Sequence, residues 1–167
     1  DSASEDQIAL SYTRFFSTAN LTQAGYAKHF SGIGTFSVGL TAFGYGDFEQ
    51  TDETGQSTGK FSAGEYLFQL GYGRQINDLF SLGGNLKFIY SELAEYKASA
   101  AAIDLSGTYY NPESHFTATV MFKNVGTPIS SYREGVSEKL PFEIQVGLSK
   151  RLDKAPLRFS IIAENLQ

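Results

Sequence analysis

The chain has 167 residues, a net charge of −5 and no cysteine. This length supports one domain, the acidic balance argues against a nucleic-acid partner, and the lack of thiols excludes disulfides and cysteine metal sites. Glycine (17 residues) and aromatic residues (14%) are abundant and proline is scarce (4 residues), which favours β structure. No run of about 18 apolar residues predicts a transmembrane helix, but a transmembrane strand needs only about 9–11 residues of alternating polarity.

Alternating apolar and polar side chains predict nine strands, because successive residues of a strand point to opposite faces. The pattern is clearest in "FSLGGNLKFIY", where Leu82, Leu86 and Phe88 alternate with Asn85 and Lys87. The predicted strands span residues 7–16, 21–30, 35–48, 63–75, 80–90, 98–110, 116–125, 142–152 and 157–165.

Three segments depart from simple alternation. Lys28 interrupts the apolar parity of the second strand, and in the third strand the parity shifts at Phe43 and Tyr45, next to glycines. Such a shift predicts a β-bulge. The segment "SELAEYKASAAA" contains helix formers and predicts a turn or two of helix.

The predicted connections differ at the two ends of this antiparallel meander. Tight turns are expected at "SGIG", "INDL", "NPESH" and "DKAP", and longer connections at "EQTDETGQSTGKFS", "SELAEYK" and "GTPISSYREGVSEKLP". Alternate connections of a meander lie at the same end, so one end is expected to carry short turns and the other long loops. Outer-membrane barrels have this asymmetry.

The two strand faces predict two solvents. We expect one face to point outward to lipid, namely Phe68, Leu70, Leu82, Leu86, Phe88, Val120 and Ile144. The opposite parity is expected to line a polar lumen, with Gln69, Asn85, Lys87, Asp104, Thr119, Gln145 and Arg151. Tyrosines and phenylalanines near strand ends are typical of the aromatic girdles of such barrels. A soluble β-sandwich would instead turn the apolar face to a protein core.

No catalytic constellation is evident, so we expect a protein that is not an enzyme and has no cofactor. His29 and His115 have no second histidine or cysteine nearby, which makes a metal site improbable. The acidic residues around Asp52 and Glu53 fit no calcium-loop spacing.

From about Thr35 onward the chain resembles the PorQ family of the type IX secretion system of Bacteroidota, which is itself similar to the FadL-like outer-membrane barrels. The resemblance rests on the order and spacing of "GTFSVGLTAFGYGDFEQTDETGQSTGKFSAGEY", "FSLGGNLKFIYSELAEY", "DLSGTYYNPESHFTAT", "NVGTPISSY", "LPFEIQVGLSKRL" and "PLRFSIIAENLQ". It implies an all-β outer-membrane barrel, of which these nine strands would form part. It also implies a non-enzymatic role in protein transport and attachment at the cell surface, beside a PorZ-like partner, outer-membrane lipid and lipopolysaccharide.

The expected partner surface lies on the long connections 49–62 and 126–141. Loops held by a rigid scaffold commonly carry function, and these two contain Asp52, Glu53, Lys60, Tyr132, Arg133 and Glu134. Two alternatives remain open: a FadL-like channel for small hydrophobic molecules, which needs an apolar pocket in the lumen, and a soluble β-sandwich binding module.

Overall fold

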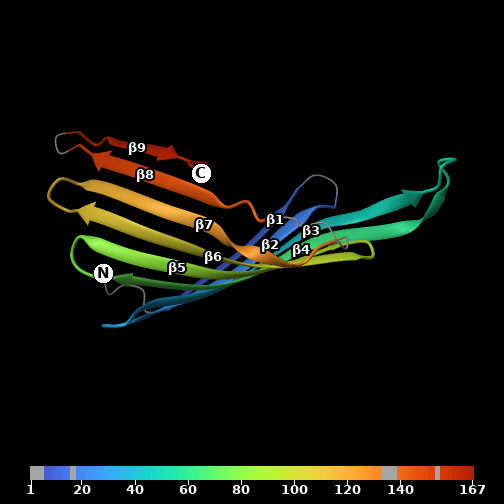
Figure 1. The fold of residues 1–167 in the computed structure, drawn as a ribbon, viewed down its shortest axis with the longest axis horizontal. Coiled ribbons are helices and arrows are strands. Elements are labelled where there is room, and N and C mark those ends of the chain that lie inside the picture. The colour runs from blue at the N-terminus through green and yellow to red at the C-terminus, as the bar shows by residue number, and fades with distance from the viewer. Residues whose placement is uncertain (1–5, 16–17, 133–138, 153–154) are drawn as a thin grey trace.

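The computed structural model describes residues 6–15, 18–132, 139–152 and 155–167. They form nine strands in one antiparallel sheet, in which each strand pairs with its neighbours in sequence (Figure 1). The strands are β1 (Asp6–Arg14), β2 (Asn20–Phe30), β3 (Gly34–Thr51), β4 (Ser57–Gln75), β5 (Phe80–Leu93), β6 (Tyr96–Asn111), β7 (Phe116–Ser130), β8 (Glu143–Arg151) and β9 (Arg158–Ala163). The nine predicted strands and their up-and-down order are confirmed.

The sheet is open. β1 and β9 are its edges, and the described residues make no closing pair between them. The strong right-handed twist expected of a large sheet makes β1–β4 cross at an angle to β5–β9 (Figure 1).

Pairing register assigns every strand residue to one of two faces, because cross-strand partners lie on the same face. We call the apolar face the side that carries Leu70, Leu86 and Ile103, which are consecutive partners across β4, β5 and β6. The polar face is the side that carries Gly71, Asn85 and Asp104, which are the adjacent set of partners. The predicted outward and inward residues separate onto these two faces.

Within the described residues, nothing covers the apolar face. Leu86 is 51% exposed, and most other large apolar side chains of this face are also exposed. Among the described residues, the buried hydrophobic side chains are Ala100 and Ala102 alone. The described residues form one layer, so the second sheet that a soluble sandwich requires is not among them.

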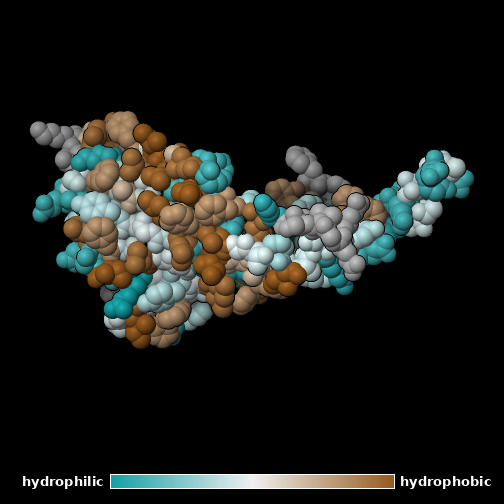
Figure 2. All heavy atoms as spheres, viewed as in Figure 1, coloured by the Kyte–Doolittle hydropathy of each residue, from teal (hydrophilic) through white to brown (hydrophobic). Residues whose placement is uncertain are grey.

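Two of the predicted long connections are wrong. Residues 49–62 belong mostly to a hairpin extension of β3 and β4, closed by a five-residue turn at Asp52–Gln56. This hairpin extends well past its neighbours (Figure 1) and its tip is hydrophilic (Figure 2). The segment "SELAEYK" is a two-residue turn, Ala94–Glu95, and the predicted helical turn is absent from it. The charged residues of these two segments therefore lie on strands and tight turns rather than on long loops.

The third long connection is partly strand. Gly126–Ser130 continues β7, and the connection proper runs over residues 131–142. The expected asymmetry between the two ends therefore rests on this connection and on the protruding β3–β4 hairpin.

The predicted bulge is confirmed. The β3–β4 register shifts between Gly44 and Gly46, where Gly46 has a φ of 85°. Beyond the shift, the parity of β3 is reversed while that of β4 is kept. Phe48 of β3 therefore stacks with Phe61 on the polar face, and the partners Glu49 and Lys60 lie on the apolar side. The apolar face thus ends at the bulge.

Ala94 has a φ of 54°, a left-handed conformation that costs a residue with a Cβ about 1–2 kcal/mol. We expect Ala94→Gly to raise the free energy of unfolding by about 0.5–1 kcal/mol after the entropic cost of glycine. Ala94→Val should lower it, because β-branched residues tolerate this conformation least. A urea titration of the three proteins checks the order, and equal stability of all three would contradict the turn geometry.

Candidate functional site

The polar face carries a compact ionic cluster formed by Lys87 of β5, Asp104 of β6 and Asn124 of β7. Lys87 Nζ lies 2.5 Å from Asp104 Oδ2, and the two side chains are only 12% and 7% exposed. Lys87 also donates to Asn124 Oδ1 at 3.1 Å. The cluster lies in the middle of the strands, where alternation predicted polar side chains.

A bulge in the β6–β7 pair makes this arrangement possible. The register shifts between Ile103 and Leu105, and Asn124 adopts a φ of 55°. Its backbone N–H donates to Asp104 Oδ1 at 2.9 Å, and its side-chain amide donates to the Pro141 carbonyl at 3.0 Å. Asn124 therefore joins the ion pair to the β7–β8 connection.

The structure groups only part of the predicted lumen set. Gln69 and Lys87 are cross-strand partners, as are Asn85 and Asp104, so these four side chains lie close together on β4–β6. Thr119 also lies on the polar face, where its hydroxyl is 3.1 Å from that of Thr108.

Two other lumen residues lie apart from this group. Gln145 belongs to a second cluster, in which it donates to Glu143 at 2.8 Å while Lys123 lies 3.2 Å from the same carboxylate. Arg151 is exposed at the end of β8, opposite Arg158. Among the described residues, the polar face thus carries two separate ion-paired groups.

Asp52 acts as the cap of the β3–β4 turn. Its Oδ1 accepts hydrogen bonds from the Thr54 hydroxyl (2.6 Å), the Thr54 N–H (2.9 Å) and the Gln56 N–H (2.9 Å). The Thr54 hydroxyl and then the Gln56 N–H hold the pKa of the Asp52 carboxyl below its usual value. Glu53 and Lys60 are exposed on the same hairpin.

Tyr132 turns inward from the end of β7, because its hydroxyl donates to Ser91 Oγ of β5. It lines a hollow of about 360 Å³ on the polar face together with Tyr45, Phe48, Phe61 and Glu65. Arg133 and Glu134, the other two residues expected at the partner surface, lie outside the described residues.

Sequence reasoning missed two groups of residues. The alternation places Asn124 in a regular strand. The one signal for a bulge there was the residue type itself, because asparagine tolerates a left-handed backbone. The second group, on the apolar face, consists of Asp6, Tyr26 and Lys28. The interruption of parity at Lys28 was the signal for it.

Nothing in the described ranges gathers three or more His, Asp or Glu side chains as metal ligands. In the same ranges, no helix has the length and apolar character needed to cross a membrane. The fold and its polar face thus define an all-β antiparallel meander with one apolar and one polar face. No protein-family model matches the chain, and no curated protein matches it, so the family resemblance stays a prediction.

The Lys87–Asp104 pair can be tested against the Lys123–Glu143 pair of the same face, whose side chains are 31% and 17% exposed. Lys87→Met should cost about 3–5 kcal/mol, because it leaves a buried carboxylate without its partner. Lys123→Met should cost clearly less, because its carboxylate partner stays better solvated. A urea titration of each variant gives its free energy of unfolding and so measures both losses.

The double variant Lys87→Met, Asp104→Asn should recover part of the loss. It removes the unpaired charge, and the new amide oxygen still accepts from the Asn124 N–H. Equal losses for Lys87→Met and Lys123→Met would contradict the importance of burial at this pair.

The Asp52 cap predicts a pH-dependent turn. A carboxyl whose pKa is lowered by folding stabilises the fold above its unfolded pKa, and this contribution is lost as the pH falls through the lower, folded value. Amide exchange at Thr54 and Gln56 should therefore quicken, relative to intrinsic rates, only below the usual pKa of aspartate. Asp52→Ala should show fast exchange at every pH, and unchanged exchange in this variant would exclude the cap.

Proposed function

We propose that this chain spans a bacterial outer membrane as part of a β-barrel and holds a surface partner at the end that carries the β3–β4 hairpin. In this proposal it is a non-enzymatic component of the type IX secretion and cell-surface attachment machinery. The observation that carries the membrane assignment is the apolar face, which extends across the sheet and is not covered by any other described part of the chain. Monomeric soluble proteins rarely expose apolar patches larger than a few hundred Å².

The dimensions of the apolar face support the assignment. Along β5 it runs from Phe80 to Tyr90, which is ten steps of about 3.4 Å, or about 34 Å. At the usual strand tilt of about 35–45° this length rises about 24–28 Å, close to the apolar band of about 25 Å in outer-membrane barrels.

Aromatic side chains mark both borders of this band, as interface girdles do. At the end with the short turns, the ring centroids of Phe80 and Tyr109 are 5.1 Å apart, and those of Tyr109 and Phe116 are 6.5 Å apart. At the other end, Tyr66 and Tyr90 are 6.2 Å apart. Beyond Tyr66, the same face continues into the charged Glu49–Lys60 pair.

A complete barrel needs partners for the free edges of β1 and β9, since hydrocarbon cannot satisfy backbone N–H and C=O groups. In an antiparallel meander all odd-numbered strands run in the same direction. β1 and β9 could therefore meet each other only as a parallel pair. A fully antiparallel barrel requires an odd number of further strands between them.

The FadL-like channel for small hydrophobic molecules is the second candidate. It is favoured by the hollow at Phe48 and Phe61, because these rings bring apolar surface to the polar face. The ionic cluster at Lys87 and Asp104 lies on the same face and argues against an apolar path beyond it. Transport of a labelled fatty acid into liposomes by the purified protein would favour the channel.

The membrane assignment predicts that arginine destabilises the protein very unequally at two neighbouring residues of β5. Leu86→Arg should cost about 2–4 kcal/mol, as lipid-facing arginine does near the bilayer midplane. Asn85→Arg should cost much less, because Asn85 points to the polar face. Unfolding titrations in lipid measure both, and comparable losses would contradict the assignment.

The partner assignment is tested by trimming the hairpin. Glu49 and Lys60 are cross-strand partners, so residues 50–59 can be replaced by Asn-Gly, a two-residue hairpin turn. The trimmed protein should insert normally but recover much less surface partner on co-purification, and cargo attachment should fall.

The matched control is the double substitution Glu92→Gln, Lys97→Gln beside the β5–β6 turn at the same end, which should leave recovery unchanged. Wild-type recovery with the trimmed protein would place the partner surface elsewhere.

A further inference from the structure

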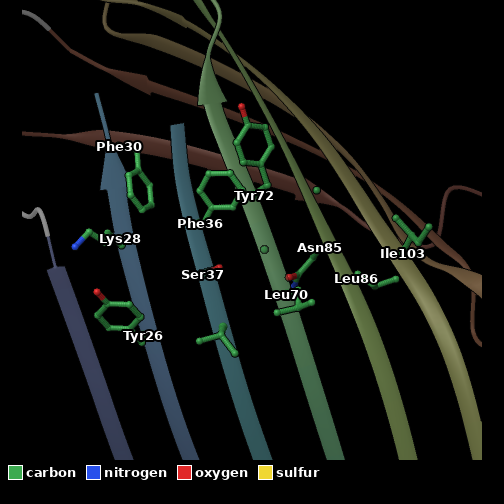
Figure 3. A pocket seen from close by; sticks show the side chains of 13 residues that line it. Tyr26, Lys28, Phe30, Phe36, Ser37, Leu70, Tyr72, Asn85, Leu86 and Ile103 are labelled. Atoms are coloured by element: carbon green, nitrogen blue, oxygen red, sulfur yellow. The ribbon is translucent and has the colours of Figure 1, made fainter. Parts of the chain in front are cut away.

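A broad hollow of about 740 Å³ lies across β2–β6, mainly on the apolar face (Figure 3). Its volume is in the range of small-molecule sites, about 300–1,000 Å³. Its floor is formed by Val38, Leu70, Leu86 and Ile103, from four successive strands. A surface that only needs to be apolar does not require such a hollow.

A glycine opens the hollow. Gly84 is the cross-strand partner of Tyr72 on one side and of Leu105 on the other, so this row of the apolar face lacks a side chain at its centre. The rings of Phe30, Phe36 and Tyr72 form a wall beside the gap, with centroids 5.8 Å and 4.9 Å apart. The result is an apolar trough next to the aromatic girdle.

An ion pair between Lys28 and the adjacent Asp6 lies at the rim of the hollow. Lys28 lines it, and Lys28 Nζ lies 3.3 Å from Asp6 Oδ1 and 5.7 Å from the Phe30 ring centroid. The Tyr26 hydroxyl donates to the same Asp6 oxygen at 2.5 Å. The Lys28 and Asp6 side chains are 42% and 53% exposed, so both are accessible to a ligand.

We propose that this hollow binds one phosphatidylethanolamine-type phospholipid. This inference rests on the proposed membrane function. An acyl chain lies in the trough above Gly84, the lipid phosphate meets the Lys28 ammonium, and the lipid amine meets the Asp6 carboxylate. Because exposed ion pairs contribute little, Lys28 and Asp6 can reorganise around the headgroup at small cost.

The charge arrangement selects this headgroup. Lys28 and Asp6 together are neutral, so an anionic headgroup gains no net attraction and brings its negative charge near Asp6. A choline headgroup lacks the N–H donors that a carboxylate accepts. A primary ammonium beside a phosphate matches both charges of the rim.

The test compares two glycines of the apolar face. At Gly84 and at Gly107, an added Cβ would meet a leucine Cδ2 at the ordinary distance of 3.5 Å, but only Gly84 lines the hollow. The delipidated protein in detergent is mixed with equal amounts of phosphatidylethanolamine, phosphatidylglycerol and phosphatidylcholine of the same acyl chains. Native mass spectrometry then counts the lipids that each variant retains.

The wild-type protein should retain about one phosphatidylethanolamine in preference to the other lipids. Gly84→Leu should weaken retention about tenfold, because the new side chain displaces about two buried methylene groups. Gly107→Leu should leave retention unchanged. Lys28→Gln should weaken it about threefold, the scale of one exposed ion pair.

Equal retention of the three lipids, equal losses for the two glycine variants, or no retained lipid would overturn the inference. Flotation of the same protein with liposomes separates this failure from that of the proposed function. If the protein floats but retains no selected lipid, only the proposed lipid site is refuted. If it stays soluble without detergent, the lipid site and the proposed membrane function are both refuted.

Discussion

The structure depends on one constraint: a single sheet must keep most of its large apolar side chains on one side, and the described residues provide no second layer to cover them. Pairing register enforces this, because a slip by one residue would move an entire strand's apolar set to the other face. The rows Val38–Leu70–Leu86–Ile103 and Ser37–Gly71–Asn85–Asp104 run side by side across four strands and never mix. In the proposed function, this exposed apolar face meets the hydrocarbon of the membrane.

The polar face is organised by ion pairs and hydrogen bonds. Lys87 and Asp104 pair across β5 and β6, and Asn124 links them to Pro141 at the end of the β7–β8 connection. Tyr132 links the start of the same connection to β5. Both described ends of the connection are therefore held over the polar face, while the β3–β4 hairpin projects away from the sheet (Figure 1). In the proposed function the first feature shapes the interior and the second meets the partner.

Alternation made the strands predictable, because the pattern at residues such as Leu82, Asn85 and Leu86 is set directly by the period of a strand. The connections were harder to predict, because charge and helix-forming composition do not distinguish a loop from a solvent-exposed hairpin. The segment around Ala94 contains good helix formers, yet pairing of Leu93 with Tyr96 closes it as a two-residue turn. Here tertiary pairing overrides local propensity.

Contacts between distant residues were also hidden from the sequence. The bulge at Asn124 depends on Asp104, 20 residues away, and the hollow at Gly84 exists only because Tyr72 and Leu105 flank it in register. Lys28 broke the apolar pattern visibly, but its partner Asp6 could be identified only once β1 and β2 were paired.

The membrane assignment requires the apolar face to contact hydrocarbon. The chain contains no cysteine, so single cysteines at residues 81–89 can each carry a spin label in the membrane-reconstituted protein. We expect accessibility to alternate with a period of two residues. Labels at Leu82, Leu86 and Phe88 should collide with dissolved oxygen and be shielded from a water-soluble nickel reagent. Labels at Asn85 and Lys87 should not show this combination. Equal access of the nickel reagent at both sets of positions would contradict the membrane assignment.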